Sequence, residues 1–237
     1  LHGSLWGNRA DLGFRLFDTT AGTAQAAPGL VADDSDTLWS LLPPSGAGVL
    51  HLIADNAARE LIPDLLLIAH LLDSGRARRA ILHVKPYPYY VSDATMPDVL
   101  DALRRLNQAR GAASSYGRTL WSAMTDGRLA VRAHPFFCAP LPYAEMPADL
   151  REQLAEATLT VVKGDLNYRR LVGDRRWPPT TPFAEVTAHF PGPVAALRTL
   201  KSDVITGLDA ETETALVAAE GQRWRTGGTH ALVQVRA

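Results

Sequence analysis

Short apolar runs separated by polar segments recur along most of this chain. The clearest run covers residues 48–54, with prolines and a glycine shortly before it and Asp55 and Asn56 directly after it. A run of this length, bounded by turn-forming residues and apolar on both faces, is typical of a buried strand in the middle of a sheet. Five further runs have the same character, at residues 80–84, 129–132, 158–162, 194–200 and 231–235. The pattern therefore predicts six strands.

Two segments between these runs show helical periodicity. Apolar positions recur at helical spacing over residues 57–72 and 96–109. Pro63 fits the first helix only near its first turn or at a kink, because proline has no backbone N–H. Asp98 lies in the first turn of the second helix, where a carboxylate is favourable. Because strands alternate with helix-length segments, we expect an α/β fold: a three-layer α/β/α arrangement around a mostly parallel, Rossmann-like sheet.

The remaining segments are rich in turn-forming residues. Residues 18–36 are small and polar, and residues 135–147 and 174–183 are rich in proline, so all three are interpreted as surface loops. We find no internal repeat, and a chain of 237 residues can bury one large core. A single domain over residues 1–237 is the resulting expectation.

Composition narrows the class of protein. A formal net charge of −1 provides no overall field for nucleic acid, which removes nucleic acid as an expected partner. The longest apolar stretch, residues 61–72, is too short to span a bilayer and is interrupted by Pro63 and Asp64. Cys138 is the only cysteine, so the fold needs no intramolecular disulfide. No signal peptide is visible, and we expect a cytoplasmic protein without a membrane partner.

Lysine is rare in this sequence. The chain has three lysines, Lys85, Lys163 and Lys201, against 21 arginines, and each lysine closes an apolar run. The two cations are not interchangeable, since lysine offers a compact point charge and arginine a planar fork. The retained lysines suggest a local anion site. The alternative is that arginine-rich codon usage left three lysines by chance.

Polar residues gather after the predicted strands. Ligands of open α/β sheets collect beyond the carboxyl ends of the strands, where loops and helix N-termini meet. Carboxylate and amide oxygens are hard ligands that favour Mg²⁺ or Mn²⁺ over zinc. The residues at these positions are Asp55, Asn56, Asp93, Lys163, Asp165, Arg198 and Lys201.

Each of these residues also has a purely structural interpretation. Asp55 with Asn56, and likewise residues 92–95, are typical helix caps or turns. Lys163 and Arg169 are candidates for solvated surface charges, and Arg198 for an ion pair with Asp203. His51 and His83 lie inside predicted strands, where buried core histidines are common. Repetition of the same chemistry at several strand ends favours the functional interpretation.

Several familiar motifs are missing from the sequence. No glycine-rich loop ends in Lys-Ser or Lys-Thr, which disfavours a P-loop nucleoside triphosphatase. The first predicted strand is followed by Asp55 and Asn56 rather than glycines, which weakens a Rossmann-type cofactor site, including one for S-adenosylmethionine. No Gly-x-Ser-x-Gly elbow of a hydrolase is present.

At these segments the sequence resembles the metal-dependent damage-control phosphatase family, formerly a domain of unknown function. It is most similar to the subfamily that includes protein-glutamate O-methyltransferase and acidic residue methyltransferase-like proteins. The most specific motifs are Lys-Gly-Asp-Leu-Asn-Tyr-Arg-Arg-Leu at residues 163–171 and Arg-Thr-Leu-Lys at residues 198–201. The other motifs are residues 5–12, Asp55 and Asn56 with Glu60, and Lys85 with Val91, Ser92 and Asp93.

The resemblance implies residue roles. A divalent metal (Mn, Mg, Co or Ni) would be bound by the catalytic residues Asp55, Asn56 and Asp93. A small phosphorylated metabolite would be bound by the following set: Asp165, Leu166, Asn167, Tyr168, Arg169, Lys201, Arg198, Lys163, Lys85 and Glu60. The implied reaction is hydrolysis of small phosphoesters such as sugar phosphates or damaged phosphometabolites.

The sequence departs from the family pattern at two places. The family usually carries a helical region ahead of the Trp-Gly-Asn segment, and we expect this chain to lack it. Residues 57–59 are Ala-Ala-Arg, where relatives more often have Ser-Gly-aromatic, which changes the expected shape of the nearby pocket. Two alternative functions remain open. One is an S-adenosylmethionine-dependent protein carboxyl methyltransferase with Glu60 near the cofactor, and the other is a non-catalytic metabolite-binding module.

Overall fold

The computed structural model describes residues 1–7, 29–46 and 48–237. The strands are β1 (Leu30–Asp33), β2 (Gly48–Ile53), β3 (Ala77–Val84), β4 (Leu129–Ala133), β5 (Leu159–Lys163), β6 (Val194–Thr199) and β7 (Ala231–Arg236). The α-helices are α1 (His2–Leu5), α3 (Ser35–Leu41), α4 (Leu61–Asp73), α5 (Met96–Gln108), α6 (Ala112–Thr125), α7 (Ala148–Ala155), α8 (Gly164–Val172), α9 (Phe183–Val186) and α10 (Ala210–Glu220). Short 3₁₀ turns are η2 (Pro135–Cys138), η3 (Tyr143–Glu145) and η4 (Arg223–Arg225).

The strands form one seven-stranded sheet. Its order is β1-β7-β6-β5-β2-β3-β4, and the β6–β7 pair is antiparallel while the other neighbours are parallel. Strand β2 lies between β5 and β3, inside the sheet, as its apolar sequence predicts. The predicted α/β class and mostly parallel sheet are confirmed.

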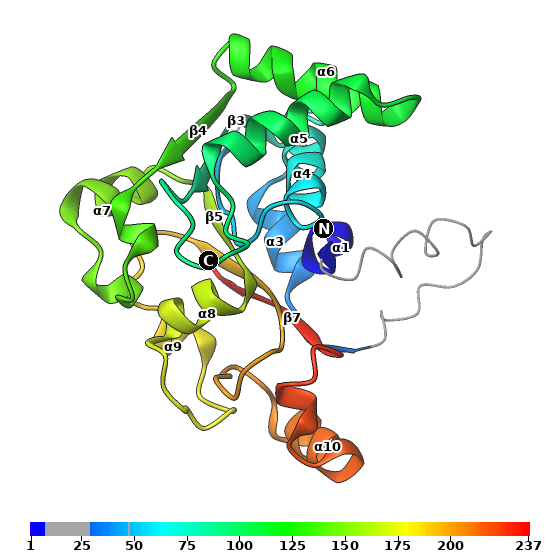
Figure 1. Ribbon diagram of the computed structural model, residues 1–237. Helices are drawn as coiled ribbons and strands as arrows, with labels where there is room; N and C mark the ends of the chain where they lie inside the picture. Colours follow the sequence, from blue (N-terminus) through cyan, green and yellow to red (C-terminus); the bar gives the residue numbers. More distant parts are fainter. Residues whose placement is uncertain (8–28, 47) are drawn as a thin grey trace.

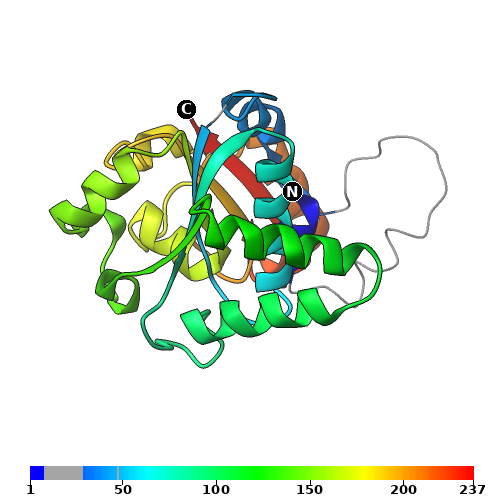
Figure 2. The ribbon, with the colours of Figure 1, turned by 90° about the horizontal axis from the view of Figure 1, so that it is seen from above.

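Helices cover both faces of the sheet (Figures 1 and 2). Helices α4, α5 and α6 lie on one face, over a core that includes Leu50, Leu82 and Leu103. Helices α7, α8 and α9 lie on the other face, over a second core that includes Phe137 and Tyr168. The two apolar clusters therefore correspond to the two sides of a three-layer fold. Within the described residues, no helix combines the length and apolar character needed to cross a membrane.

Two predicted boundaries are wrong. Residues 30–36 were expected in a loop, but they contain β1 and the start of α3, while residues 18–28 lie outside the described part. The helix predicted from residue 57 begins at Leu61, because Ala58 adopts a positive φ of 52° that breaks regular helical structure before it. Pro63 then falls in the first turn, where its missing N–H costs no hydrogen bond.

The second predicted helix is confirmed almost to the residue. Helix α5 begins after Thr95, and Asp98 completes a capping box by accepting a hydrogen bond from the Thr95 backbone N–H at 2.9 Å. The interpretation of residues 92–95 as a helix cap is therefore correct for Thr95. The proline-rich residues 135–147 contain only the two short 3₁₀ turns.

Two buried histidines face each other on the α7 side of the sheet. Nε2 of His83 lies 3.0 Å from Nδ1 of His51, and both residues are almost fully buried. Burial, then the Arg132 and Arg79 charges, lower the pKa of His51 to about 4. Burial, then the neighbouring His51, lower the pKa of His83 to about 3. Both side chains are therefore neutral core residues near neutral pH.

This pair predicts acid sensitivity of the fold. Both folded-state pKa values lie below the ordinary histidine pKa of 6.5, so the unfolded chain binds more protons than the folded chain as the pH falls below 6.5. We expect the free energy of unfolding to fall by about 2 kcal/mol for each histidine between about pH 7 and about pH 5. Urea denaturation at the two pH values measures this loss. His51→Gln should reduce it, whereas the exposed control His70→Gln should leave it intact; an unchanged loss in His51→Gln would contradict the assignment.

Candidate functional site

A cleft opens where strands β2, β5 and β6 end. It is lined by Ser4, Leu5, Asp55, Glu60, Lys163, Gly164, Leu197, Thr199 and Lys201. Asp55 follows β2, Gly164 follows β5, and Lys201 follows β6. Residues from four separate parts of the sequence thus meet at the carboxyl edge of the sheet, where α/β proteins bind ligands.

Asp55 lies against the backbone at the start of α8. A Cβ built on Gly164 would approach Oδ2 of Asp55 to 1.9 Å, and Gly164 has a φ of +85°. Only glycine satisfies both conditions, which explains the Lys-Gly-Asp sequence at this turn. Burial, followed by the nearby Glu60 carboxylate, raises the pKa of Asp55 to about 7. Burial, more than any neighbouring charge, therefore opposes ionisation of the Asp55 carboxyl group.

Asn56 links Asp55 to the loop after β3. Its Nδ2 donates to Oδ2 of Asp55 at 3.2 Å and to Oε1 of Glu60 at 3.0 Å, while its Oδ1 accepts from Ser92 at 2.7 Å. The backbones of Asn56 and Asp93 also pair in an isolated antiparallel bridge. Burial raises the pKa of Glu60. These contacts place Asp93 next to the end of β2.

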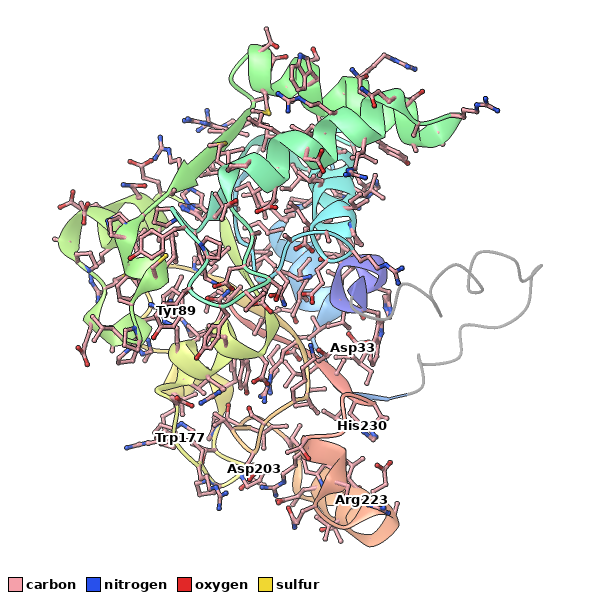
Figure 3. All side chains as sticks on the ribbon, in the orientation of Figure 1. Asp33, Tyr89, Trp177, Asp203, Arg223 and His230 are labelled. Carbon is pink, nitrogen blue, oxygen red and sulfur yellow. The ribbon has the colours of Figure 1, made fainter. Side chains whose placement is uncertain are left out.

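Asp93 is buried and fully hydrogen-bonded. Its Oδ1 pairs with the buried ammonium of Lys85, and its Oδ2 accepts from the backbone N–H groups of Tyr89 at 2.9 Å and Tyr90 at 2.5 Å. Tyr89, labelled in Figure 3, lies on the loop between β3 and α5. This loop therefore wraps around the Asp93 carboxylate and fixes its position.

Lys163 has a structural partner that the sequence did not reveal. Its Nζ donates to Oδ1 of Asp64 at 2.7 Å and to Oγ of Ser4 at 2.9 Å, and it also contacts the Ser4 carbonyl. Lys163 and Asp64 are both nearly fully buried. The lysine therefore joins β5 to α4 and α1 directly beneath the cleft. The only sequence signal for this partner is Asp64 itself, the one carboxylate within the mainly apolar residues 61–72.

Arg198 and Asp165 hold the loop that carries Lys201. Arg198 is fully buried, donates from Nε to Asp165 at 2.8 Å, and lies over the Tyr168 ring at 4.3 Å. Its Nη2 donates to the carbonyl and the hydroxyl of Ser202, at 3.1 and 2.9 Å. Asp165 in turn accepts from the Lys201 backbone N–H at 3.4 Å. The alternative pairing of Arg198 with Asp203 is wrong, since Asp203 pairs with Arg176 at 2.9 Å.

The remaining residues of the predicted set on α8 serve different purposes. Asn167 is buried and donates to the carbonyls of Ala54 and Lys163, at 3.2 and 2.9 Å, which ties the end of β2 to α8. Tyr168 is buried and donates to Gln234 at 3.0 Å. Leu166 is half-buried in the first turn of α8. Arg169 points to the surface and forms a two-point ion pair with Asp174, at 2.6 and 2.9 Å.

The structure thus sorts the predicted residues into three groups. Asp55, Asn56, Asp93, Glu60 and Lys201 lie at or beside the cleft. A second group stabilises the surrounding loops from within, namely Lys85, Lys163, Asp165, Arg198, Asn167 and Tyr168. The third group is Leu166, which is half-buried in the first turn of α8, and Arg169, which lies with Asp174 instead of in the cleft. Motif residues 8–12 lie outside the described part.

The described residues contain no group of three or more His, Cys, Asp or Glu side chains arranged to hold a metal ion. The candidate ligands at the carboxyl edge of the sheet are instead two carboxylates, Asp55 and Asp93, and one amide, Asn56. Hard oxygen donors of this kind suit Mg²⁺ or Mn²⁺. The half-buried Asp55 carboxylate accepts a hydrogen bond from Asn56 and has a raised pKa, and both features are consistent with a cation ligand.

Comparison with known proteins gives consistent matches. The family model of the damage-control phosphatase ARMT1-like domain matches residues 1–217. Damage-control phosphatase ARMT1 of Danio rerio is 35% identical over 251 aligned positions, and that of Mus musculus is 33% identical over 249. Each alignment covers 98% of this chain and 56% of the relative, so the chain spans little more than half the length of these relatives.

A solved structure of a DUF89 family protein from Pyrococcus horikoshii is also similar, with a TM-score of 0.48 and 14% identity. The alignment covers 85% of this chain and 55% of that chain. The family assignment depends on the sequence matches, which extend over most of the chain. On that evidence, the chain belongs to the family of damage-control phosphatase ARMT1-like domains.

Proposed function

We propose that this chain hydrolyses small phosphoesters, with sugar phosphates or damaged phosphometabolites as substrates, in a metal-dependent reaction in the cytoplasm. The observation that carries the proposal is the meeting of Asp55 with Lys201 in one cleft, beside Asn56 and Asp93. Oxygen ligands and a cation in one cleft are what phosphoryl transfer needs, because this reaction depends on positioning and charge neutralisation. Family membership supports the same reaction class.

Asp55, Asn56 and Asp93 would hold the divalent metal, with manganese or magnesium favoured by the all-oxygen set and cobalt or nickel as further candidates. A bound ion of this kind supplies Lewis acidity and a water of lowered pKa. Asp55 contributes a half-buried carboxylate, and Asp93 contributes a carboxylate whose charge is partly offset by Lys85. Asn56 contributes a neutral oxygen, which limits the negative charge near an anionic substrate.

The phosphate would lie between Lys201 and the N-terminus of α8. Lys201 is exposed on the wall of the cleft, and Gly164 places the first turn of α8 on the same cleft. The first N–H groups of a helix have no intrahelical acceptor and favour anions, which gives Asp165 and Leu166 a backbone role. Arg169 is left out of the proposed contacts, because both ends of its guanidinium fork are bound to Asp174.

A phosphatase screen tests the proposal. The purified chain is assayed for inorganic phosphate release from a panel of phosphometabolites with Mn²⁺, Mg²⁺, Co²⁺ or Ni²⁺, and with EDTA. We expect release that requires the added metal. The two alternatives are tested alongside by calorimetry with S-adenosylmethionine: cofactor binding without any phosphate release would favour methyl transfer. Absence of both signals would favour a non-catalytic binding module.

Lys201→Ala should lower kcat/KM for phosphate release by roughly 10²-fold, because an aimed cation stabilises charge in the transition state. Arg176→Ala is the matched control, since Arg176 is an exposed cation on the neighbouring loop that pairs with Asp203. Steady-state kinetics of both variants measure the difference. Equal kcat/KM values of the two variants would contradict a role of Lys201 in the reaction.

A further inference from the structure

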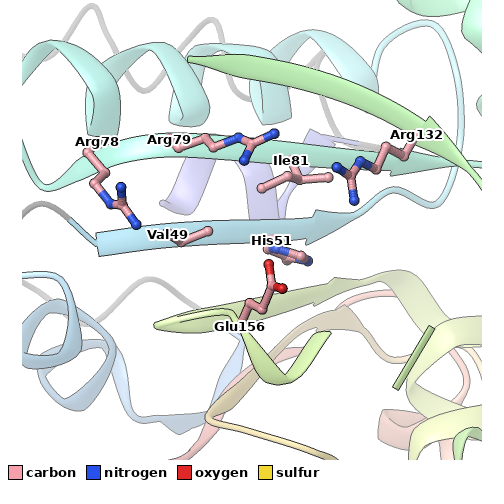
Figure 4. A pocket seen from close by; sticks show the side chains of 7 residues that line it. All are labelled: Val49, His51, Arg78, Arg79, Ile81, Arg132 and Glu156. Atoms are coloured by element: carbon pink, nitrogen blue, oxygen red, sulfur yellow. The ribbon is translucent and has the colours of Figure 1, made fainter. Parts of the chain in front are cut away.

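A second pocket lies on the sheet away from the candidate active site. It has a volume of about 350 Å³ and is lined by Val49, His51, Arg78, Arg79, Ile81, Arg132 and Glu156 (Figure 4). Its floor is the α7 side of β2 and β3, where Val49 pairs with Arg79 and His51 with Ile81. Asp55 follows the carboxyl end of β2, whereas Val49 lies near its start. The two sites are therefore at different ends of the same strand.

The pocket exists because the second apolar core stops short of it. That core covers Ile53 of β2 and Val162 of β5, at the carboxyl ends of the strands. Further back, Arg78 and Arg79 of β3 and Arg132 of β4 take the place of apolar side chains. Helix α7 ends at Ala155, and Glu156 follows at the rim. The sheet is thus left open over a polar floor.

Positive charge in this pocket lacks counter-ions. Arg78 and Arg79 form no ion pair within the described residues, and Arg132 donates only to the neutral Gln153, at 3.2 Å. Figure 4 shows Arg79 and Arg132 extending toward each other over Ile81, with Glu156 reaching up from the opposite wall. The three guanidinium groups and the one carboxylate that line the pocket give it a net charge of about +2.

Two buried polar atoms, one in this pocket and one beside its floor, also lack partners. Nε of Arg79 is buried without a hydrogen-bond partner in the described structure, and so is Oγ1 of Thr160. Thr160 is fully buried and pairs with His51 across β2 and β5, which places it beside the pocket floor. An unsatisfied buried donor costs free energy unless a ligand or water completes it. His51 is neutral, because burial and the two arginines lower its pKa. Its Nδ1 lies 3.0 Å from Nε2 of His83, which leaves Nε2 of His51 as the nitrogen that could bond to a ligand.

We propose that this pocket binds a small doubly charged oxyanion, such as a phosphate or a dicarboxylate, held by Arg79 and Arg132. Guanidinium groups recognise such oxygens through paired N–H donors, and two of them aimed at one space define a dianion site. The volume lies at the lower end of small-molecule pockets, which favours a small ligand over a protein segment. Glu156 limits the excess charge and would accept a hydrogen bond from a ligand hydroxyl.

Calorimetry on the metal-free chain in EDTA and low-salt buffer tests this site. The probes are inorganic phosphate and succinate, titrated separately, so that the two sources of the dianion are distinguished. We expect one binding event for at least one probe. Arg79→Gln and Arg132→Gln should each weaken it about 10-fold or more, because each removes a charged hydrogen-bonding fork. Circular dichroism confirms that the variants fold.

Two controls separate this pocket from other anion sites. Arg128→Gln removes an equal charge from an exposed arginine of the same region that pairs with Asp126, and Lys201→Ala removes the cation of the candidate active site. Both should retain the binding event. No binding of either probe, equal weakening in Arg128→Gln, or loss of the event in Lys201→Ala alone would each overturn the proposal.

Discussion

Asp55→Asn should eliminate nearly all metal-dependent phosphate release, with a fall in kcat of roughly 10³-fold or more, because it removes a negatively charged ligand without changing shape. The substitution keeps the side chain volume beside Gly164, where there is no room for a larger group. The metal-free protein should remain folded. Burial raises the pKa of Asp55, so its carboxylate opposes folding at neutral and higher pH, and the neutral amide removes that cost.

Phosphate release and thermal unfolding of Asp55→Asn should be measured on the same preparation. Asp101→Asn is the control, because Asp101 is an exposed carboxylate on α5 that pairs with Arg105. The control should keep full activity. Substantial activity in Asp55→Asn, or a loss of activity that is accompanied by unfolding, would contradict a direct role of Asp55 in the reaction.

Lys163→Met should destabilise the protein by about 3–5 kcal/mol, because it leaves the buried Asp64 carboxylate without its counter-ion. Both partners are nearly fully buried, so solvent does not compensate for the lost charge. Lys163 also holds Ser4 of α1, and this segment lines the cleft. We therefore expect loss of activity to follow loss of stability in this variant.

The double variant Asp64→Leu/Lys163→Met distinguishes a structural from a catalytic lysine. Removing both charges together should recover much of the stability, since a buried ion pair is often replaceable by apolar residues. Urea denaturation of the two single variants and the double variant gives the coupling energy. If Lys163→Met has the same free energy of unfolding as the wild type, the buried ion pair does not stabilise the protein.

The sheet was predictable because most of its strands are continuous apolar runs. Strand β1 was missed because it has only four residues, one of them Asp33, and because β7 is its one neighbour among the described strands. The antiparallel direction of β7 could not be predicted from the sequence either, because parallel and antiparallel strands can have the same apolar pattern. Positive φ at Ala58 moved the start of α4, and no local residue type signals it.

The candidate site was predictable to the extent that topology brings strand ends together. Asp55, Asn56 and Lys201 meet at the cleft region because β2 and β6 both flank β5 and run parallel to it. Interior partners were not predictable. Lys163 is 99 residues from Asp64 and 159 from Ser4, and no local pattern encodes such contacts.

The three lysines illustrate the same limit. All three lie at the candidate site, but only Lys201 is exposed to a ligand, while Lys85 and Lys163 neutralise buried aspartates. Arg198 is similar, since its guanidinium positions the loop of Lys201 through Asp165 and Ser202. The residue type at a strand end therefore indicates that a charge is needed there. Only the fold shows whether that charge contacts a substrate or another group of the protein.

Anomalous diffraction from crystals of the chain grown with Mn²⁺ would locate the proposed metal site. We expect one strong manganese peak within coordination distance of oxygen atoms from Asp55, Asn56 and Asp93, and its absence in crystals of Asp55→Asn. A peak elsewhere on the protein, or one that persists in Asp55→Asn, would contradict this assignment.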